Sequence, residues 1–250
     1  MLLVVVLVSS VMVIKQIYQY KAGQKIYQDA QNLAGLGNMN QAGEDEESRI
    51  KKMDLLAEIN DENLDNLDIG ALREVNKDVI GWITIPGTPV SYPLLDGDDN
   101  SYYLNRTWDK KWNTMGSIFL EAECSSKFSE FNTIIYGHNM RNTTMFSSLK
   151  KYLKEDFWKE APYVYIVTQN GVRRYDIFAA CEVSVKGHAF WIDIEDDELK
   201  EKFISSALDM SVIETGIVPD IEDKIITLST CTGNGYEKRM VVQAVWTAVD

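Results

Sequence analysis

The sequence is poor in the residues from which metal centres and disulfide frameworks are usually built. It contains three cysteines and two histidines in 250 residues, and their spacing does not include the close pairs that bind zinc. It also lacks a glycine-rich phosphate loop, an internal repeat and a low-complexity tract. We therefore expect neither a metal nor a cofactor.

Basic residues are outnumbered, with 25 Lys and Arg against 38 Asp and Glu, which gives a formal net charge of −13. A protein that binds nucleic acid neutralises the phosphates with clustered Lys and Arg, so we expect no nucleic-acid partner. The acidic excess is concentrated in residues 44–68, which hold ten acidic and three basic residues. We interpret this stretch as a solvated helical face and linker.

The apolar run at the N-terminus, residues 1–14, is too short to cross a membrane by itself, since a span needs about 20 residues. No basic segment precedes it and no small-residue cleavage site follows it, so a complete secretory signal is not expected. We interpret residues 1–14 as a partial membrane anchor with its outer end at Lys15 and the remaining chain outside the cell. The alternative is a buried core helix in a soluble protein.

The most informative motif is a cysteine at the end of an apolar strand pattern. Residues 227–233 read Thr-Leu-Ser-Thr-Cys-Thr-Gly, and Arg239 follows Cys231 by eight residues, at the start of the run Met-Val-Val-Gln-Ala-Val-Trp. His138, in Thr-Ile-Ile-Tyr-Gly-His-Asn, also lies where an apolar run gives way to a turn. Three strand ends thus carry a nucleophile, a proton carrier and an anion binder.

These residue types suit acyl transfer. A thiolate attacks a carbonyl, negative charge develops on the carbonyl oxygen, and the leaving amine needs a proton. Histidine exchanges a proton near neutral pH, and arginine stays charged and presents a fork of donors to an oxyanion. Cys231, His138 and Arg239 are therefore the candidate catalytic residues.

The arrangement resembles the sortases, cysteine transpeptidases of Gram-positive bacteria, whose signature is a Thr-Leu-x-Thr-Cys strand with an arginine on the following strand. Residues 78–95 and 99–104 look like the opening strands of the same family, so the resemblance covers about residues 78–248. Class B is the nearest subgroup, because it has a long helical segment before the first strand and a helix inserted before the cysteine strand. Residues 48–78 and 195–210 have the apolar spacing of such amphipathic helices.

We therefore predict a mostly β protein with helices: a closed eight-stranded sortase-type β-barrel with N-terminal helices and an inserted helix before the cysteine strand. The expected organisation is a partial membrane anchor at 1–14, an N-terminal helical segment and linker at 15–77, and a catalytic barrel at 78–250. A helical stripe between 145 and 157 is expected to pack against the barrel. The candidate strands are residues 82–85, 90–92, 117–120, 133–136, 163–167, 173–180, 225–228 and 240–247.

The resemblance implies an enzyme at the cell membrane, with one N-terminal anchor and an extracellular catalytic domain. Cys231 would cleave a C-terminal sorting signal of a secreted protein after its threonine and form a thioester. Arg239 would stabilise the oxyanion, and His138 would protonate the leaving amine and then deprotonate the amine of a peptidoglycan precursor. Ser229 matches a family position that contacts substrate.

Other interpretations remain open at this point. Some class B members have an acidic residue just after the cysteine, whereas the first acid here is Glu237, so a carboxylate partner for His138 is not expected. Cys124 and Cys181 are interpreted as buried free thiols, with a disulfide between them as the alternative. His188 is interpreted as an exposed loop residue. The competing functions are a papain-like or other cysteine hydrolase and a non-catalytic membrane-tethered binding module.

Overall fold

Eight strands rich in β-branched and aromatic residues form the body of the protein, as these residue types favour. The computed structural model describes residues 2–36, 64–233 and 237–247. The strands are β1 (Val79–Thr84), β2 (Ser91–Leu95), β3 (Ile118–Leu120), β4 (Asn132–Tyr136), β5 (Tyr163–Thr168), β6 (Gly171–Ser184), β7 (Ile225–Cys231) and β8 (Lys238–Thr247). Each corresponds to one strand that the sequence predicts, and the predicted fold class is confirmed.

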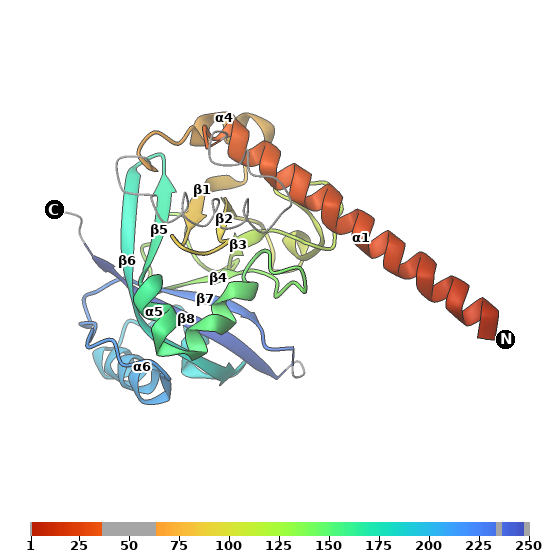
Figure 1. Ribbon diagram of the computed structural model, residues 1–250. Coiled ribbons are helices and arrows are strands. Elements are labelled where there is room, and N and C mark those ends of the chain that lie inside the picture. The colour runs from red at the N-terminus through yellow and green to blue at the C-terminus, as the bar shows by residue number, and fades with distance from the viewer. Residues whose placement is uncertain (1, 37–63, 234–236, 248–250) are drawn as a thin grey trace.

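The strands close into a barrel in the order β1-β2-β3-β4-β7-β8-β6-β5, and β5 pairs with β1 to complete the ring (Figure 1). The pairs β2/β3 and β4/β7 are parallel, and the other pairs are antiparallel. Because β4 and β7 run in the same direction, their carboxyl ends meet at one rim. Strand β8 begins at that rim, since it runs antiparallel to β7.

Strand β7 extends further along the chain than the sequence expectation. Strand β7 was expected to end at Leu228, but it continues through Cys231, because Thr230 and Cys231 pair with Met240 and Arg239 of β8. The pairing with β8 thus satisfies the main-chain hydrogen-bonding groups of this stretch. The carboxyl end of β7 therefore lies three residues beyond the strand expected at 225–228.

The inserted helix is α6 (Asp197–Met210), and it begins where the acidic cluster predicts. The carboxylate of Asp196 caps it by accepting a hydrogen bond from the Leu199 amide at 3.0 Å. The buried face of α6 includes Phe203, which packs against Phe131 of the barrel wall in a second apolar cluster outside the main core. This cluster fixes α6 on the outer surface of the barrel.

The N-terminal region begins with one long helix. Residues Leu2–Leu33 form one helix, α1, which runs through the boundary expected at residue 14. Its later part packs on the barrel through buried Tyr27 and Ala30, whereas the segment from Val11 to Tyr18 is exposed and projects from the body (Figure 1). Within the described ranges, no helix has both the length and the apolar character needed to cross a bilayer.

The helical segment expected at 48–78 lies partly outside the described residues, which exclude 37–63. Its described end contains α4 (Ile69–Val75), which is capped by Asp68 and packs beside β1. The stripe expected between 145 and 157 forms two short helices, η3 (Ser147–Leu153) and α5 (Glu155–Glu160), because Lys154 adopts an extended backbone between them. Two further short helices are η2 (Tyr102–Asn105) and η4 (His188–Phe190).

Candidate active site

Cys231 and Arg239 lie directly opposite each other where β7 and β8 meet the rim. Directly opposed residues of an antiparallel pair share one face of the sheet, with Cβ atoms about 5 Å apart. The Cys231 side chain is exposed and that of Arg239 is half-buried. The register therefore places the side chains of Cys231 and Arg239 on one face of the two paired strands.

His138 reaches the same rim from β4. Tyr136, the last residue of β4, pairs with Ser229 of β7, and the Gly137 amide donates a hydrogen bond to the Ser229 carbonyl at 3.2 Å. The Thr230 hydroxyl in turn donates to the Gly137 carbonyl at 2.7 Å. These bonds tie the residue before His138 to the two residues before Cys231. The three predicted residues are thus brought to one rim, and their catalytic roles stay a prediction.

The His138 ring is oriented by a main-chain carbonyl. Its Nε2 lies 2.7 Å from the carbonyl oxygen of Leu104, in η2. A carbonyl can only accept, so Nε2 carries the hydrogen and donates it. In the neutral ring, Nδ1 is then the atom that can accept a proton.

Two side chains that the sequence analysis did not single out hold the main chain around the thiol. Asn139 donates from Nδ2 to the Cys231 carbonyl at 2.8 Å. Lys150 of η3 donates from Nζ to the carbonyl of Thr232, the residue after the cysteine. The position of Asn139 beside His138 is a signal that could have pointed to it. Lys150 gave no such signal, because it lies in a segment that reads as a packing helix.

Ser229 lies two residues before Cys231 and therefore on the same strand face. It is only 1% exposed, and its Oγ has no hydrogen-bond partner among the described residues. A buried hydroxyl without a partner costs about 1–3 kcal/mol. The substrate-binding role proposed for Ser229 from the sequence stays a prediction.

The other cysteines do not contribute to the site. Cys124 and Cys181 are buried free thiols, so the interpretation of free cysteines is confirmed and the alternative disulfide is not formed. Burial raises the pKa of the Cys124 thiol to about 12 and that of Cys181 to about 11. Both are therefore protonated and shielded at neutral pH.

The interpretation of His188 as an exposed loop residue is wrong. It begins the short helix η4 and is half-buried, with its ring 4.3 Å from the ring of Trp191. The Trp191 carbonyl accepts a hydrogen bond from Asn132 of β4, which helps to hold this segment against the barrel. Local packing thus orders a stretch whose polar sequence reads as a loop.

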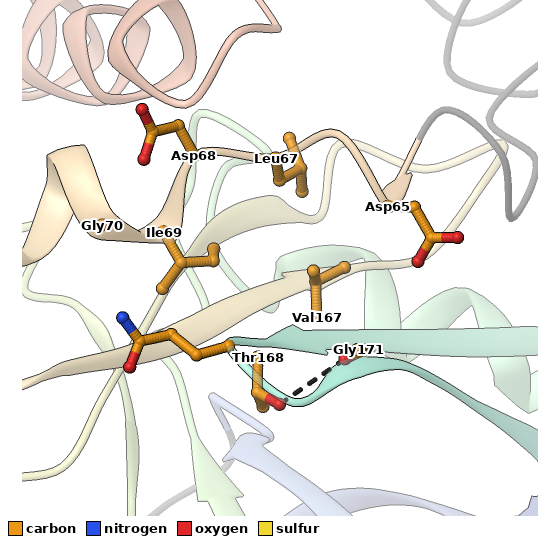
Figure 2. Close-up of a pocket in the computed structure, with 9 residues that line it drawn as sticks. Asp65, Leu67, Asp68, Ile69, Gly70, Val167, Thr168 and Gly171 are labelled. Carbon is orange, nitrogen blue, oxygen red and sulfur yellow. Dashed lines mark hydrogen bonds between the residues drawn. The ribbon is translucent and has the colours of Figure 1, made fainter.

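A polar pocket of about 390 Å³ lies elsewhere, between the segment that leads into α4 and the turn between β5 and β6 (Figure 2). Its lining includes Asp65, Asp68 and Thr168, and contains neither a cysteine nor a histidine. Gly171, also in the lining, begins β6, whereas the residue of β6 that pairs with Arg239 is Val183, near the other end of that strand. The pocket is therefore distinct from the rim that holds Cys231.

The described residues contain no group of three His, Cys, Asp or Glu side chains that could hold a metal ion.

Comparison with known proteins agrees with this geometry. Residues 83–247 match the family model of the sortase domain. Sortase B of Staphylococcus aureus is 31% identical over 230 residues, which cover 91% of this chain and 90% of that protein. Sortase B of Listeria monocytogenes is 34% identical over 229 residues, which cover 90% and 88%.

Solved structures give the same result. A Staphylococcus aureus sortase B–substrate complex matches with a TM-score of 0.75 and 28% identity, over 93% of this chain and 100% of that one. A sortase B complexed with triglycine matches with a TM-score of 0.68 and 33% identity, over 72% and 86%. The chain therefore belongs to the sortase family of cysteine transpeptidases, within class B.

Proposed function

We propose that this chain cleaves a C-terminal sorting signal of secreted proteins after its threonine and transfers the protein to an amine of the cell-wall peptidoglycan. The observation that carries the proposal is the register of Cys231 opposite Arg239, with the main-chain carbonyl of Cys231 bonded by Asn139, the residue after His138. Family membership supports the reaction type. The relatives solved with a substrate and with triglycine support a peptide donor and a peptide amine acceptor.

In the proposed first half-reaction, Sγ of Cys231 attacks the carbonyl carbon of the threonine and its proton passes to Nδ1 of His138. Arg239 stabilises the negative charge that develops on the carbonyl oxygen. The carbon–nitrogen bond then breaks, and the leaving amine takes the proton from Nδ1. A thioester on Cys231 remains, and the imidazole is neutral again.

In the second half-reaction, the acceptor amine attacks the thioester and gives a proton to Nδ1. The carbon–sulfur bond breaks, and the Cys231 thiolate regains the proton. Because the Leu104 carbonyl holds the hydrogen on Nε2, the same ring nitrogen accepts and returns the proton in both halves. Water is the competing acceptor, and its attack would give hydrolysis.

The competing interpretations differ in what they require of Cys231. A papain-like hydrolase places its cysteine at a helix N-terminus, whereas Cys231 ends a β-strand, which favours the sortase mechanism. A membrane-tethered binding module would need none of the three residues.

Sortases act at the cell envelope, and we propose that the catalytic barrel lies outside the cell with anchoring through the apolar residues 1–14.

A peptide-library cleavage assay tests the proposal. The full chain should cleave sorting-signal peptides after threonine, form a hydroxylamine-sensitive acyl adduct detectable by intact mass, and join the acyl fragment to an added amine. Cys231→Ala should form no adduct and His138→Ala should lose turnover. An unchanged rate in Cys231→Ala would refute the proposal, and cleavage without transfer to any amine would identify a hydrolase instead.

A further inference from the structure

We propose that Tyr27 of the N-terminal helix α1 is a positioning residue for His138, acting through Gly116 to keep the Leu104 carbonyl on Nε2 of the ring. The inference rests on the proposed role of His138 and concerns how that side chain is held. Tyr27 lies more than one hundred residues before His138 in the sequence, on a helix that precedes the barrel. Its contribution to the site therefore arises only from the fold.

The contact begins with the Tyr27 hydroxyl. Tyr27 is 4% exposed, and its hydroxyl donates to the carbonyl of Gly116 and lies 3.1 Å from Oγ of Ser117. Burial raises the pKa of Tyr27 above its ordinary value, so the hydroxyl stays a donor throughout the neutral range. A phenylalanine at this position would fill the same space without the donor.

Gly116 touches both partners of the histidine contact. Its φ is +59°, and a Cβ there would lie 2.6 Å from the Leu104 carbonyl oxygen and 2.9 Å from Cδ2 of His138, the ring carbon bonded to Nε2. The next amide, that of Ser117, donates to the Tyr103 carbonyl at 2.9 Å. The main chain at Gly116 is thus packed against the bond between Leu104 and His138, and Tyr27 holds that main chain in place.

A second set of contacts connects Tyr27 to the turn that contains His138 and Asn139. The Tyr27 ring meets the Tyr92 ring edge to face, with centroids 5.2 Å apart. The Tyr92 hydroxyl accepts from the Met145 amide at 3.1 Å, and Met145 forms a β-bridge with Asn139. Both routes to the His138 turn therefore start from one side chain of α1.

Other contacts fix α1 on the loop that contains Gly116. Trp108 donates from Nε1 to the Ile26 carbonyl at 3.1 Å, and Asn113 donates from Nδ2 to the Gln19 carbonyl at 3.0 Å. These bonds use the main chain of the helix, so they persist when the Tyr27 hydroxyl is removed. The hydroxyl can thus be tested without detaching the helix.

The experiment compares Tyr27→Phe with Tyr18→Phe in the full chain. Tyr18 lies on the same helix and is 71% exposed, so the same chemical change there should have no effect. The chain has only two histidines, so nitrogen-15 labelling of histidine gives two ring systems, and His188→Gln assigns them. In the wild type, His138 should carry its hydrogen on Nε2.

Tyr27→Phe should shift the His138 ring towards a mixture of tautomers and lower kcat by about ten-fold with little change in KM, because the loss of one buried hydrogen bond misplaces the proton carrier. Gly116→Ala should have a larger effect of the same kind. Ser117→Ala removes the hydrogen bond from Ser117 Oγ to the Arg106 carbonyl but leaves the bond from Tyr27 to the Gly116 carbonyl, so it gives the stability comparison, with the tautomer retained.

A wild-type tautomer and kcat in Tyr27→Phe would overturn the proposal. Equal tautomer loss in Ser117→Ala at the same melting temperature would also overturn it, because the effect would then be general loosening. The proposed catalytic role fails separately: full activity of His138→Ala would refute that role, while the ring spectra would still report whether Tyr27 orients His138.

Discussion

At the scale of single residues, the three cysteines differ in what surrounds the sulfur atom. Cys231 is exposed at the end of β7, whereas Cys124 and Cys181 are buried. The thiolate is the reactive form of cysteine, and burial keeps the pKa of the two buried thiols far above neutral. Chemical reactivity should therefore separate one thiol from the other two.

We predict that iodoacetamide at neutral pH adds once to the native chain, at Cys231, and abolishes turnover without changing the circular dichroism spectrum. Intact mass and peptide mapping measure the number and position of adducts. Cys231→Ala is the control and should remain unmodified. Labelling of Cys124 or Cys181 in the folded protein would contradict the prediction.

Arg239→Lys keeps the positive charge and loses the planar fork of donors. If Arg239 holds the oxyanion, turnover should fall by at least about ten-fold, as the loss of one oxyanion donor usually costs that much or more. Lys238→Arg, one residue earlier on the exposed side of β8, is the matched control. A rate close to that of the wild type would remove Arg239 from the mechanism.

The parts of the candidate site that depend on particular side chains could be predicted from the sequence. Cys231, His138 and Arg239 are rare or charged residues at strand ends, so they could be read from the sequence. The Leu104 contact could not, because its acceptor is a main-chain carbonyl that every residue possesses. Tyr27 was also missed, since only the packing of α1 brings its hydroxyl to Gly116.

At the scale of elements, the strands were predicted because each one carries its own apolar pattern. The helices were predicted less well, because tertiary contacts decide where they begin and end. The apolar spacing of residues 195–210 comes from Leu199, Phe203 and Ala207, of which Phe203 and Ala207 are buried and Leu199 is 44% exposed. The apolar spacing located the helix, and the capping residue Asp196 fixed its start.

Phe203→Ala should lower the free energy of unfolding by about 3–5 kcal/mol, because it opens a cavity where α6 meets Phe131 of the barrel wall. Leu199→Ala on the same helix removes an exposed side chain and should change the free energy of unfolding by less than about 1 kcal/mol. Urea denaturation measures both values. Equal losses would show that α6 does not pack through the Phe203 face.

The Lys150 link joins η3 to the residue after the cysteine. Lys150→Met keeps most of the apolar stem and removes the charged donor to the Thr232 carbonyl. We expect a loss of about 1.5–3 kcal/mol in unfolding free energy, which is the usual contribution of a hydrogen bond from a charged group. Lys154→Met, at an exposed position just after η3, is the control, and equal stability of the two variants would contradict the link.

At the scale of the whole molecule, two aspartates next to each other at the start of the barrel respond to pH with opposite signs. Burial alone would raise the pKa of Asp78, but hydrogen bonds from Lys110 and Tyr103 outweigh it and lower the pKa. Burial, together with the nearby charge of Asp78, raises the pKa of Asp96. Asp78 therefore stabilises the folded state when ionised, and Asp96 destabilises it when ionised.

Asp78→Asn should lower the melting temperature at pH 7, and the difference from the wild type should shrink as the pH falls through the lowered pKa of Asp78. Asp96→Asn should raise the melting temperature at pH 7, because it removes the cost of ionising a carboxyl group whose pKa is raised, and this gain should vanish in acid. Thermal scans between pH 3 and pH 7 measure both, and shifts of the same sign at pH 7 would contradict the assignment.

Because β7 and β8 carry Cys231 and Arg239, closing the barrel and assembling the candidate active site are the same event. Strands β1 to β6 are synthesised first and can pair only as the open sheet β4-β3-β2-β1-β5-β6, which leaves the edges of β4 and β6 unpaired. The last hairpin, β7–β8, fills the gap between those edges and brings Cys231 and Arg239 with it. The pairings of β7 with β4 and of β8 with β6 join strands that are distant in sequence, and such pairings form slowly. A nascent chain therefore has no assembled nucleophile until its final hairpin is inserted, and the same event removes the exposed edges that favour aggregation.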